Sequence, residues 1–244
     1  MNSALLLLLV VVLGVVALAM FSSSRASGNR NAASLADAKA DARRAIERLG
    51  GQVLNLNGTD EASKQAMADA SERFTAASSQ IDQATTAKQA MLAKESALEG
   101  LYYVRAARLA MGMDPGPELE TIAGQRSAGA VTEDRRIEFD GRQIEASPVP
   151  SQNTPNYYPG GRVAGRPVPA GWYSEPWWKP ALRAGAWGVG SVLLFDALFS
   201  GMGGVGYNAA AFENGYGSGF DQGFDSGFDQ GYDAGMDQGT DVGG

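Results

Sequence analysis

The most regular spacing of residues that could bind a metal ion in this chain is a series of aspartates near its C-terminal end. From Asp221 onward an aspartate recurs at every fourth position, each with a glycine two positions before it. Calcium-binding loops place their ligands two positions apart or use a nonapeptide with paired glycines, so a spacing of four fits neither pattern. Repulsion between like charges and repeated glycines also disfavour a helix. We therefore predict a disordered Gly/aromatic/Asp repeat tail over residues 207–244, without specific metal sites.

Histidine and cysteine are absent from the chain. Their absence excludes the catalytic arrangements built on His or Cys, and it excludes the commonest metal ligands. The segment GGRVAG at residues 160–165 has a glycine spacing near that of a phosphate-binding loop, but Arg166-Pro167 follows it in place of Lys-Ser/Thr. We therefore predict that the protein is not an enzyme and has no catalytic, cofactor-binding or metal-binding residues.

A single acid, Asp196, stands near the centre of an apolar, glycine-rich segment over residues 181–206. The aromatic residues that precede this segment resemble the belt found at a membrane interface. We predict a transmembrane helix here; the alternatives are a buried or interfacial helix and a re-entrant segment. An acid within a membrane is a functional candidate by default. Small residues that would suit helix association recur along the segment: Ala186, Gly190, Ala197 and Gly201.

Residues 4–21 form a second uncharged apolar run, which as a helix would span roughly 27 Å, close to the hydrocarbon thickness of a bilayer. We predict an uncleaved transmembrane anchor. The alternative is a signal peptide, which needs a basic region that Met1-Asn2-Ser3 does not supply. Basic residues follow the first segment and precede the second, so the positive-inside rule places residues 22–180 in the cytoplasm and both termini outside. The expected localisation is therefore a multi-pass plasma-membrane protein in contact with membrane lipid.

The region over residues 34–113 has helical spacing, with Leu35, Ala42, Leu49 and Leu56 seven positions apart as in a coiled coil. Gly50-Gly51 interrupts this pattern and predicts a break. Thr59 or Asp60 is expected to cap the next helix, and Thr86 with Gln89 predicts a capping box for a third. Asp114-Pro115 is expected to end that helix. The region is predicted to be a helical hairpin or a three-helix bundle, giving a mainly α protein.

Residues 114–180 are predicted to be a linker that contains a small β-hairpin. Alternating residues over 135–146 surround Asp140-Gly141, which is the strongest short-range signal for a hairpin turn. The stretch from Pro148 to Pro180 is rich in proline, which favours an extended linker. A ligand for a proline-recognising partner is the alternative interpretation.

The net charge of −7 lies entirely in the tail, because seven of the 27 acids and none of the 20 bases follow Gly201. Neither part of the chain has a strongly basic surface, so no nucleic-acid partner is expected. We predict a non-enzymatic scaffold or interaction module whose helical domain binds protein partners at the cytoplasmic face or a second copy of itself. The alternative is an accessory subunit of a transport or proton-linked membrane complex that uses Asp196.

Three segments of the chain resemble an actinobacterial family of membrane-anchored proteins that carry a domain of unknown function. They are ARRAIERLGGQVLNLNGTDEASKQAMADASERF, LAKESALEGLYYVRAARLAMGMDPGPEL and PNYYPGGRVAGRPVPAGWYSEPWWKPA. The resemblance covers roughly residues 34–206. It implies a membrane-anchored architecture, and it implies no catalytic or binding residue.

Overall fold

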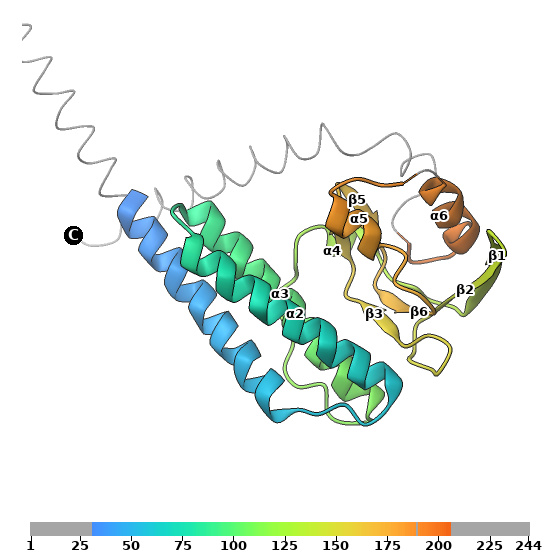
Figure 1. Ribbon diagram of the computed structural model, residues 1–244, viewed down its shortest axis with the longest axis horizontal. Coiled ribbons are helices and arrows are strands. Elements are labelled where there is room, and N and C mark those ends of the chain that lie inside the picture. The colour runs from blue at the N-terminus through green and yellow to red at the C-terminus, as the bar shows by residue number, and fades with distance from the viewer. Residues whose placement is uncertain (1–30, 189, 206–244) are drawn as a thin grey trace, which may run out of the picture. The chain divides into compact units, whose positions relative to one another are not determined.

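The computed structural model describes residues 31–188 and 190–205 of the chain (Figure 1). The chain divides into two compact units, Met1–Leu54 with Ser71–Gly100, and Asn55–Ala70 with Leu101–Gly244. Helices α2 (Glu61–Gln83) and α3 (Ala87–Ala110) each contribute residues to both units. The anchor predicted at residues 4–21 and the repeat tail predicted at residues 207–244 lie outside the described residues.

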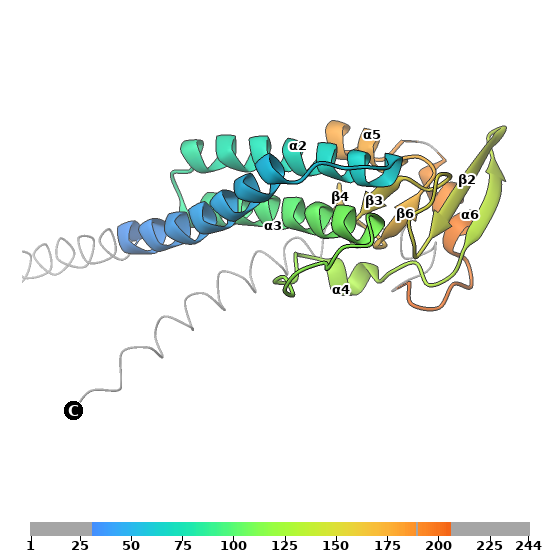
Figure 2. The same cartoon turned by 90° about the horizontal axis from the view of Figure 1, so that it is seen from below.

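The first unit consists of helices that pack through alanine, glycine and a few large side chains. A helix whose described part covers residues 31–55 runs beside α2 and α3, as Figures 1 and 2 both show. Gly100 of α3 lies so close to the first helix that a Cβ there would be 2.4 Å from Cδ2 of Leu49. Across the α2–α3 pair, Ser96 Oγ donates to Gln80 Oε1 at 2.7 Å, and Arg73 pairs with Glu99 at 3.4 Å.

The predicted break at Gly50-Gly51 is wrong, because the first helix continues through both glycines. Gly50 is buried and faces the ring of Phe74 on α2; a Cβ at Gly50 would lie 2.8 Å from Cε2 of that ring. A Cβ at Gly51 would meet nothing within 4 Å. The glycine at position 50 therefore serves the close approach of two helices, a role that local propensity does not reveal.

Both predicted helix caps are confirmed. Asp60 is the residue that caps α2: its carboxylate accepts from Ser63 N–H at 2.8 Å, and Ser63 Oγ accepts from Asp60 N–H at 3.1 Å. At the start of α3, Gln89 N–H donates to Thr86 Oγ1 at 3.2 Å, while Thr86 N–H donates to Gln89 Oε1 at 3.1 Å. These reciprocal bonds satisfy amide groups that have no partner inside the helix.

Helix α3 ends at Ala110, a few residues before the proline-containing stop that the sequence predicts. Gly112 has a φ of +68°, and Met113 N–H donates to the carbonyl of Arg108 at 2.8 Å, which forms a Schellman end. In the second unit, Arg105 Nη1 then donates to the carbonyls of Gly116 and Pro117, each at 3.0 Å. These contacts hold the segment that leads to the short helix α4 (Gln125–Ala128).

The second unit is built on a four-stranded antiparallel sheet with the order β1-β2-β6-β3. The sequence predicts a hairpin around Asp140-Gly141, and the structure pairs β1 with β2 there; both turn residues have positive φ, 51° and 70°, as a type I′ turn requires. Strands β4 and β5 form a separate hairpin that contains GGRVAG. The strands are β1 (Arg135–Phe139), β2 (Arg142–Ser147), β3 (Asn156–Tyr158), β4 (Gly161–Val163), β5 (Arg166–Val168) and β6 (Gly171–Tyr173).

The prediction that the proline-rich stretch is an extended linker is wrong, because this stretch supplies four of the six strands in the described part of the chain. Pro159 and Pro169 are fully buried beside the ends of short strands, where the missing amide donor removes no ladder hydrogen bond. Tyr173 is also fully buried, and its hydroxyl donates to the carbonyl of Pro169 at 2.7 Å. The buried aromatic and proline side chains of this stretch therefore form part of the core.

The predicted second transmembrane helix is wrong. Residues 181–206 contain part of α5 (Lys179–Ala184) and all of α6 (Ser191–Phe199), and Gly185 ends α5 with a φ of +67°. As a nine-residue helix, α6 is about 14 Å long, far short of the roughly 30 Å hydrocarbon thickness. It lies over β1 and β2 (Figure 1). Four of its side chains belong to the core: Leu194, Phe195, Leu198 and Phe199.

Among the described residues, no helix has both the length and the apolar character that a membrane crossing needs. The prediction of a multi-pass membrane protein is therefore wrong, because residues 181–206 do not form the second of its two spans. The aromatic residues assigned to an interfacial belt have another place: Tyr173 and Trp178 are buried in the same core as α6, with ring centroids 5.0 Å apart. The prediction of a mainly α fold is also wrong, because the second unit is built on a four-stranded antiparallel sheet.

Helix α5 is held against the α2 residues that belong to the second unit. Lys179 Nζ donates to Asp69 Oδ1 at 2.5 Å, and Asp69 is 4% exposed. Gln65 also donates to this carboxylate, at 3.4 Å. A buried carboxylate is tolerated only when charged and polar partners surround it, and Lys179 supplies the charged partner from the first turn of α5.

Candidate cavity of the second unit

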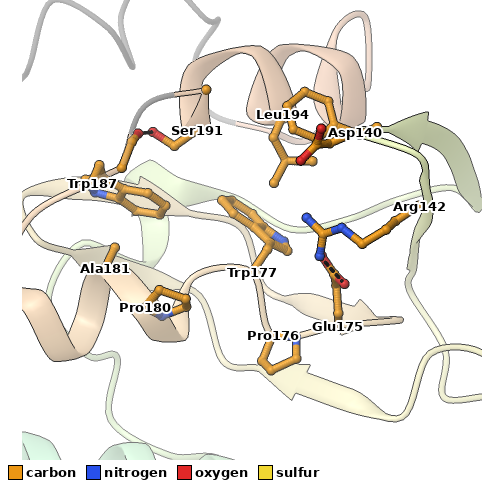
Figure 3. Close-up of a pocket in the computed structure, with 13 residues that line it drawn as sticks. Asp140, Arg142, Glu175, Pro176, Trp177, Pro180, Ala181, Trp187, Ser191 and Leu194 are labelled. Carbon is orange, nitrogen blue, oxygen red and sulfur yellow. Dashed lines mark hydrogen bonds and ion pairs between the residues drawn. The ribbon is translucent and has the colours of Figure 1, made fainter.

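A cavity of about 410 Å³ lies in the second unit between the β1–β2 turn, the segment that follows β6, and helices α5 and α6 (Figure 3). Its lining combines aromatic and aliphatic side chains with a few polar groups. The lining residues are Phe139, Asp140, Arg142, Glu175, Pro176, Trp177, Pro180, Ala181, Trp187, Gly188, Gly190, Ser191 and Leu194. We call this space the cavity below.

The strand register places Arg142 and Glu175 side by side at the cavity. Strand β2 is antiparallel to β6, with Ala146 opposite Tyr173, so the residues after Tyr173 run beside those that precede Ala146. Arg142 Nη1 donates to both carboxylate oxygens of Glu175, at 2.8 and 2.9 Å. The Nη2 and Nε groups of Arg142 have no hydrogen-bond partner among the described residues. In Figure 3 the second terminal nitrogen of Arg142 points away from Glu175.

This ion pair contributes little to stability. The Arg142 side chain is 56% exposed and that of Glu175 30% exposed, and a solvent-exposed pair typically contributes about 0–1 kcal/mol. The pair instead presents oriented donors and acceptors at the wall of the cavity. The position of the pair at the cavity therefore favours a role in binding over a role in folding.

Two tryptophans form the aromatic wall of the cavity. The ring centroids of Trp177 and Trp187 are 5.7 Å apart, with their planes at 40°. Trp187 Nε1 donates to the carbonyl of Val163 at 2.8 Å, which anchors that ring on β4. Trp177 Nε1 is buried and has no hydrogen-bond partner among the described residues. A buried unpaired donor of this kind costs roughly 1–3 kcal/mol.

The remaining polar groups add acceptors. Asp140 is exposed in the β1–β2 turn, and Figure 3 shows its carboxylate on the same side of the cavity as the Arg142 guanidinium. Ser191 Oγ donates to the carbonyl of Gly188 at 2.9 Å and keeps its lone pairs. The cavity therefore offers donors and acceptors beside aromatic faces.

Of the predicted helix-association face and the predicted intramembrane acid, one residue lines the cavity. Gly190 lines the cavity and precedes α6 with a φ of +88°, while Gly201 follows α6 with a φ of +71°. Ala186 lies in the connection between α5 and α6, so Ala197 is the only small residue of the predicted association face within α6. Asp196 is exposed on α6, opposite the buried leucines and phenylalanines. The four small residues therefore do not lie along one helix.

Sequence reasoning missed the residues that line the cavity. The sequence predicts a membrane interface for the aromatic residues that include Trp177. It gives no signal that pairs Arg142 with Glu175, because 33 residues separate them. The dense tryptophans before α5 were the available signal, since such residues also line binding sites. Within the described ranges, no group of three or more acidic side chains is placed to hold a metal ion.

Comparisons of the chain with protein-family models, with curated proteins and with solved structures give no match. The resemblance drawn from the three sequence segments therefore stays a prediction.

Proposed function

We propose that this protein is a non-enzymatic binding protein and that its ligand occupies the cavity of the second unit. The observation that supports the proposal most directly is the lining of the cavity, where the rings of Trp177 and Trp187 stand beside the Arg142–Glu175 ion pair. Aromatic faces next to a few polar groups are typical of a ligand site.

The size and lining of the cavity also support binding. Ligand cavities typically have volumes of roughly 300–1,000 Å³, with apolar and aromatic walls and a few convergent polar groups. The cavity has a volume of about 410 Å³, and its polar groups, Arg142, Glu175 and Asp140, lie together near one end of the tryptophan wall (Figure 3).

Binding is favoured over catalysis by what the polar groups already do. The hydroxyl among the lining residues, Ser191 Oγ, donates to a backbone carbonyl and not to a base that could activate it. Glu175 is engaged by Arg142 at 2.8 Å, and the chain has no histidine to exchange protons near neutral pH. A helical first unit that binds protein partners remains a separate prediction.

The proposal is tested by closing the cavity in the full-length chain. Gly188 lines the cavity, and a Cβ there would meet nothing within 4 Å, so Gly188→Trp should fill the space without disturbing the fold. The probe is a set of small neutral alcohols, amides and cyclic ethers, screened by NMR on the indole N–H resonances of the four tryptophans. We expect fragments that shift the resonances of Trp177 and Trp187 in the parent protein and not in the variant.

Gly51→Trp is the matched control, because Gly51 is also exposed and unobstructed but belongs to the first helix. It should bind fragments as the parent does. The proposal fails if no fragment shifts the two indole resonances, or if Gly188→Trp and Gly51→Trp bind the fragments equally.

A further inference from the structure

We infer that the ligand of the cavity is a neutral carbohydrate, with one face of a sugar ring against the tryptophan wall and its hydroxyl groups on the Arg142–Glu175 pair. The inference rests on the proposed function and adds the chemical class of the ligand. It follows from the charges, the ring geometry and the hydrogen-bonding groups of the cavity.

The charges around the cavity favour a ligand without net charge. A carboxylate or phosphate that reaches Arg142 also meets Glu175, which is bonded to the same guanidinium at 2.8 Å, and faces Asp140 on the same side (Figure 3). A cationic ligand drawn to these two acids meets the guanidinium between them. Like charges brought together in this way act against either ion, whereas a neutral polar ligand meets no such repulsion.

The tryptophan geometry determines how a ligand can use the aromatic wall. At a centroid separation of 5.7 Å and a tilt of 40°, the rings of Trp177 and Trp187 already contact each other. A planar base or a quaternary ammonium group therefore has no space between them. A ligand must lie over an outward face, and the C–H groups on one side of a sugar ring suit the negative face of an indole.

The hydrogen-bonding groups distinguish a sugar from a proline-rich peptide. Proline-rich segments dock on aromatic walls, but each proline offers a carbonyl acceptor and no N–H donor. Such a peptide could pair with Arg142, but it would bring no donor to the carboxylate of Asp140. A sugar hydroxyl both donates and accepts, so one ring can pair with the guanidinium and with the carboxylates beside it.

The size of the cavity suits a short oligosaccharide. Its volume of about 410 Å³ is near the lower end of the usual range for ligand sites, roughly 300–1,000 Å³. The groups that would contact the sugar are held by regular structure or by fixed contacts. Arg142 belongs to β2, and the ring of Trp187 is bonded to β4 through Val163. A site held in this way binds without a large ordering cost.

The test is a titration of the full-length protein with maltose, cellobiose and N,N′-diacetylchitobiose, followed by the tryptophan indole N–H resonances in NMR spectra. We expect at least one disaccharide to shift the Trp177 and Trp187 resonances saturably. Tetramethylammonium chloride, sodium acetate and a proline decamer at the same concentrations should leave them unchanged. Arg142→Met should weaken disaccharide binding about tenfold, which corresponds to the loss of one hydrogen bond to a charged group.

Arg48→Met is the matched control, because Arg48 is exposed on the first helix and outside the cavity. Its disaccharide affinity should equal that of the parent. If Arg142→Met does not fold, Glu175→Gln is the second test variant, because it keeps the shape of the side chain. It should also weaken disaccharide binding severalfold.

The outcomes separate this inference from the proposed function. If neutral fragments bind at the cavity but none of the disaccharides does, or if the proline decamer binds instead, the carbohydrate assignment is overturned while the binding function stands. Disaccharide affinities that are equal in the parent, Arg142→Met and Glu175→Gln also overturn it. If neither fragments nor disaccharides bind, both proposals fail.

Discussion

Two side chains of the same type, Trp177 and Trp187, have opposite hydrogen-bonding states in this protein. They contact each other at the wall of one cavity, yet the indole of Trp187 is bonded to Val163 and that of Trp177 is buried without a partner among the described residues. A bonded donor contributes to stability, and an unpaired buried donor opposes it. The indole of Trp187 therefore contributes a hydrogen bond to the stability of the fold, whereas the indole of Trp177 contributes only its ring contacts.

Replacing each tryptophan with phenylalanine should expose this difference. Trp187→Phe removes the bond to Val163 and should lower the free energy of unfolding by about 1 kcal/mol more than Trp177→Phe, which removes only an unsatisfied donor. Both variants lose similar ring area, so the difference reports the hydrogen bond. Urea unfolding of the two variants measures it, and an equal loss of stability in both would contradict the assignment.

The helices of the first unit depend on where glycine stands. Gly50 and Gly51 are adjacent in the same helix, but the first faces the ring of Phe74 at close range and the second faces open space. In an exposed helix interior, glycine is less stable than alanine by about 1 kcal/mol. At a packed position, the added methyl group must displace a neighbour, which typically costs about 1–3 kcal/mol.

Alanine at these two positions should therefore change stability in opposite directions. Gly51→Ala should raise the free energy of unfolding by up to about 1 kcal/mol, because it improves helix propensity and touches nothing. Gly50→Ala should lower it by about 1 kcal/mol or more, since its Cβ would lie 2.8 Å from Cε2 of Phe74. Thermal or urea unfolding compares the two; stabilisation by Gly50→Ala would show that this helix contact is looser than the structure has it.

The stability of the whole molecule should depend on pH in alkaline solution, because two tyrosines of the second unit are buried. Burial raises the pKa of Tyr157 to about 12 from 10.0; nearby Tyr102 also raises it, and Arg105 acts in the opposite direction. Burial likewise raises the pKa of Tyr173 well above its ordinary value. The folded protein keeps these phenol protons at a pH where the unfolded chain has lost them.

The free energy of unfolding should therefore fall as the pH rises above about 10. The contribution of these tyrosines is complete below that pH, and Tyr157 loses about 1.4 kcal/mol per pH unit until the pH reaches about 12. Urea unfolding at pH 9 and pH 11 measures the decline. Tyr157→Phe keeps the ring contacts with Tyr103 and Trp172 and should show a smaller decline; an unchanged decline would contradict the assignment.

Features that depend on near neighbours could be predicted from the sequence alone. Asp60, Thr86 and Gln89 cap their helices through bonds that span three residues, and Asp140-Gly141 turns the β1–β2 hairpin because both residues tolerate positive φ. The absence of His and Cys likewise excluded whole classes of catalytic and metal sites. Each of these depends on local chemistry that packing elsewhere did not override.

The tertiary structure alone decided where the second apolar segment lies and which side chains meet at the cavity. Leu194 and Phe195 are equally apolar in a bilayer and in a protein core, so composition cannot choose between them. The choice depends on an apolar partner surface, which Ile144 on β2 supplies once the proline-rich stretch has folded beside it. The same register brings Arg142 to Glu175. Only a folded sheet brings such distant residues together.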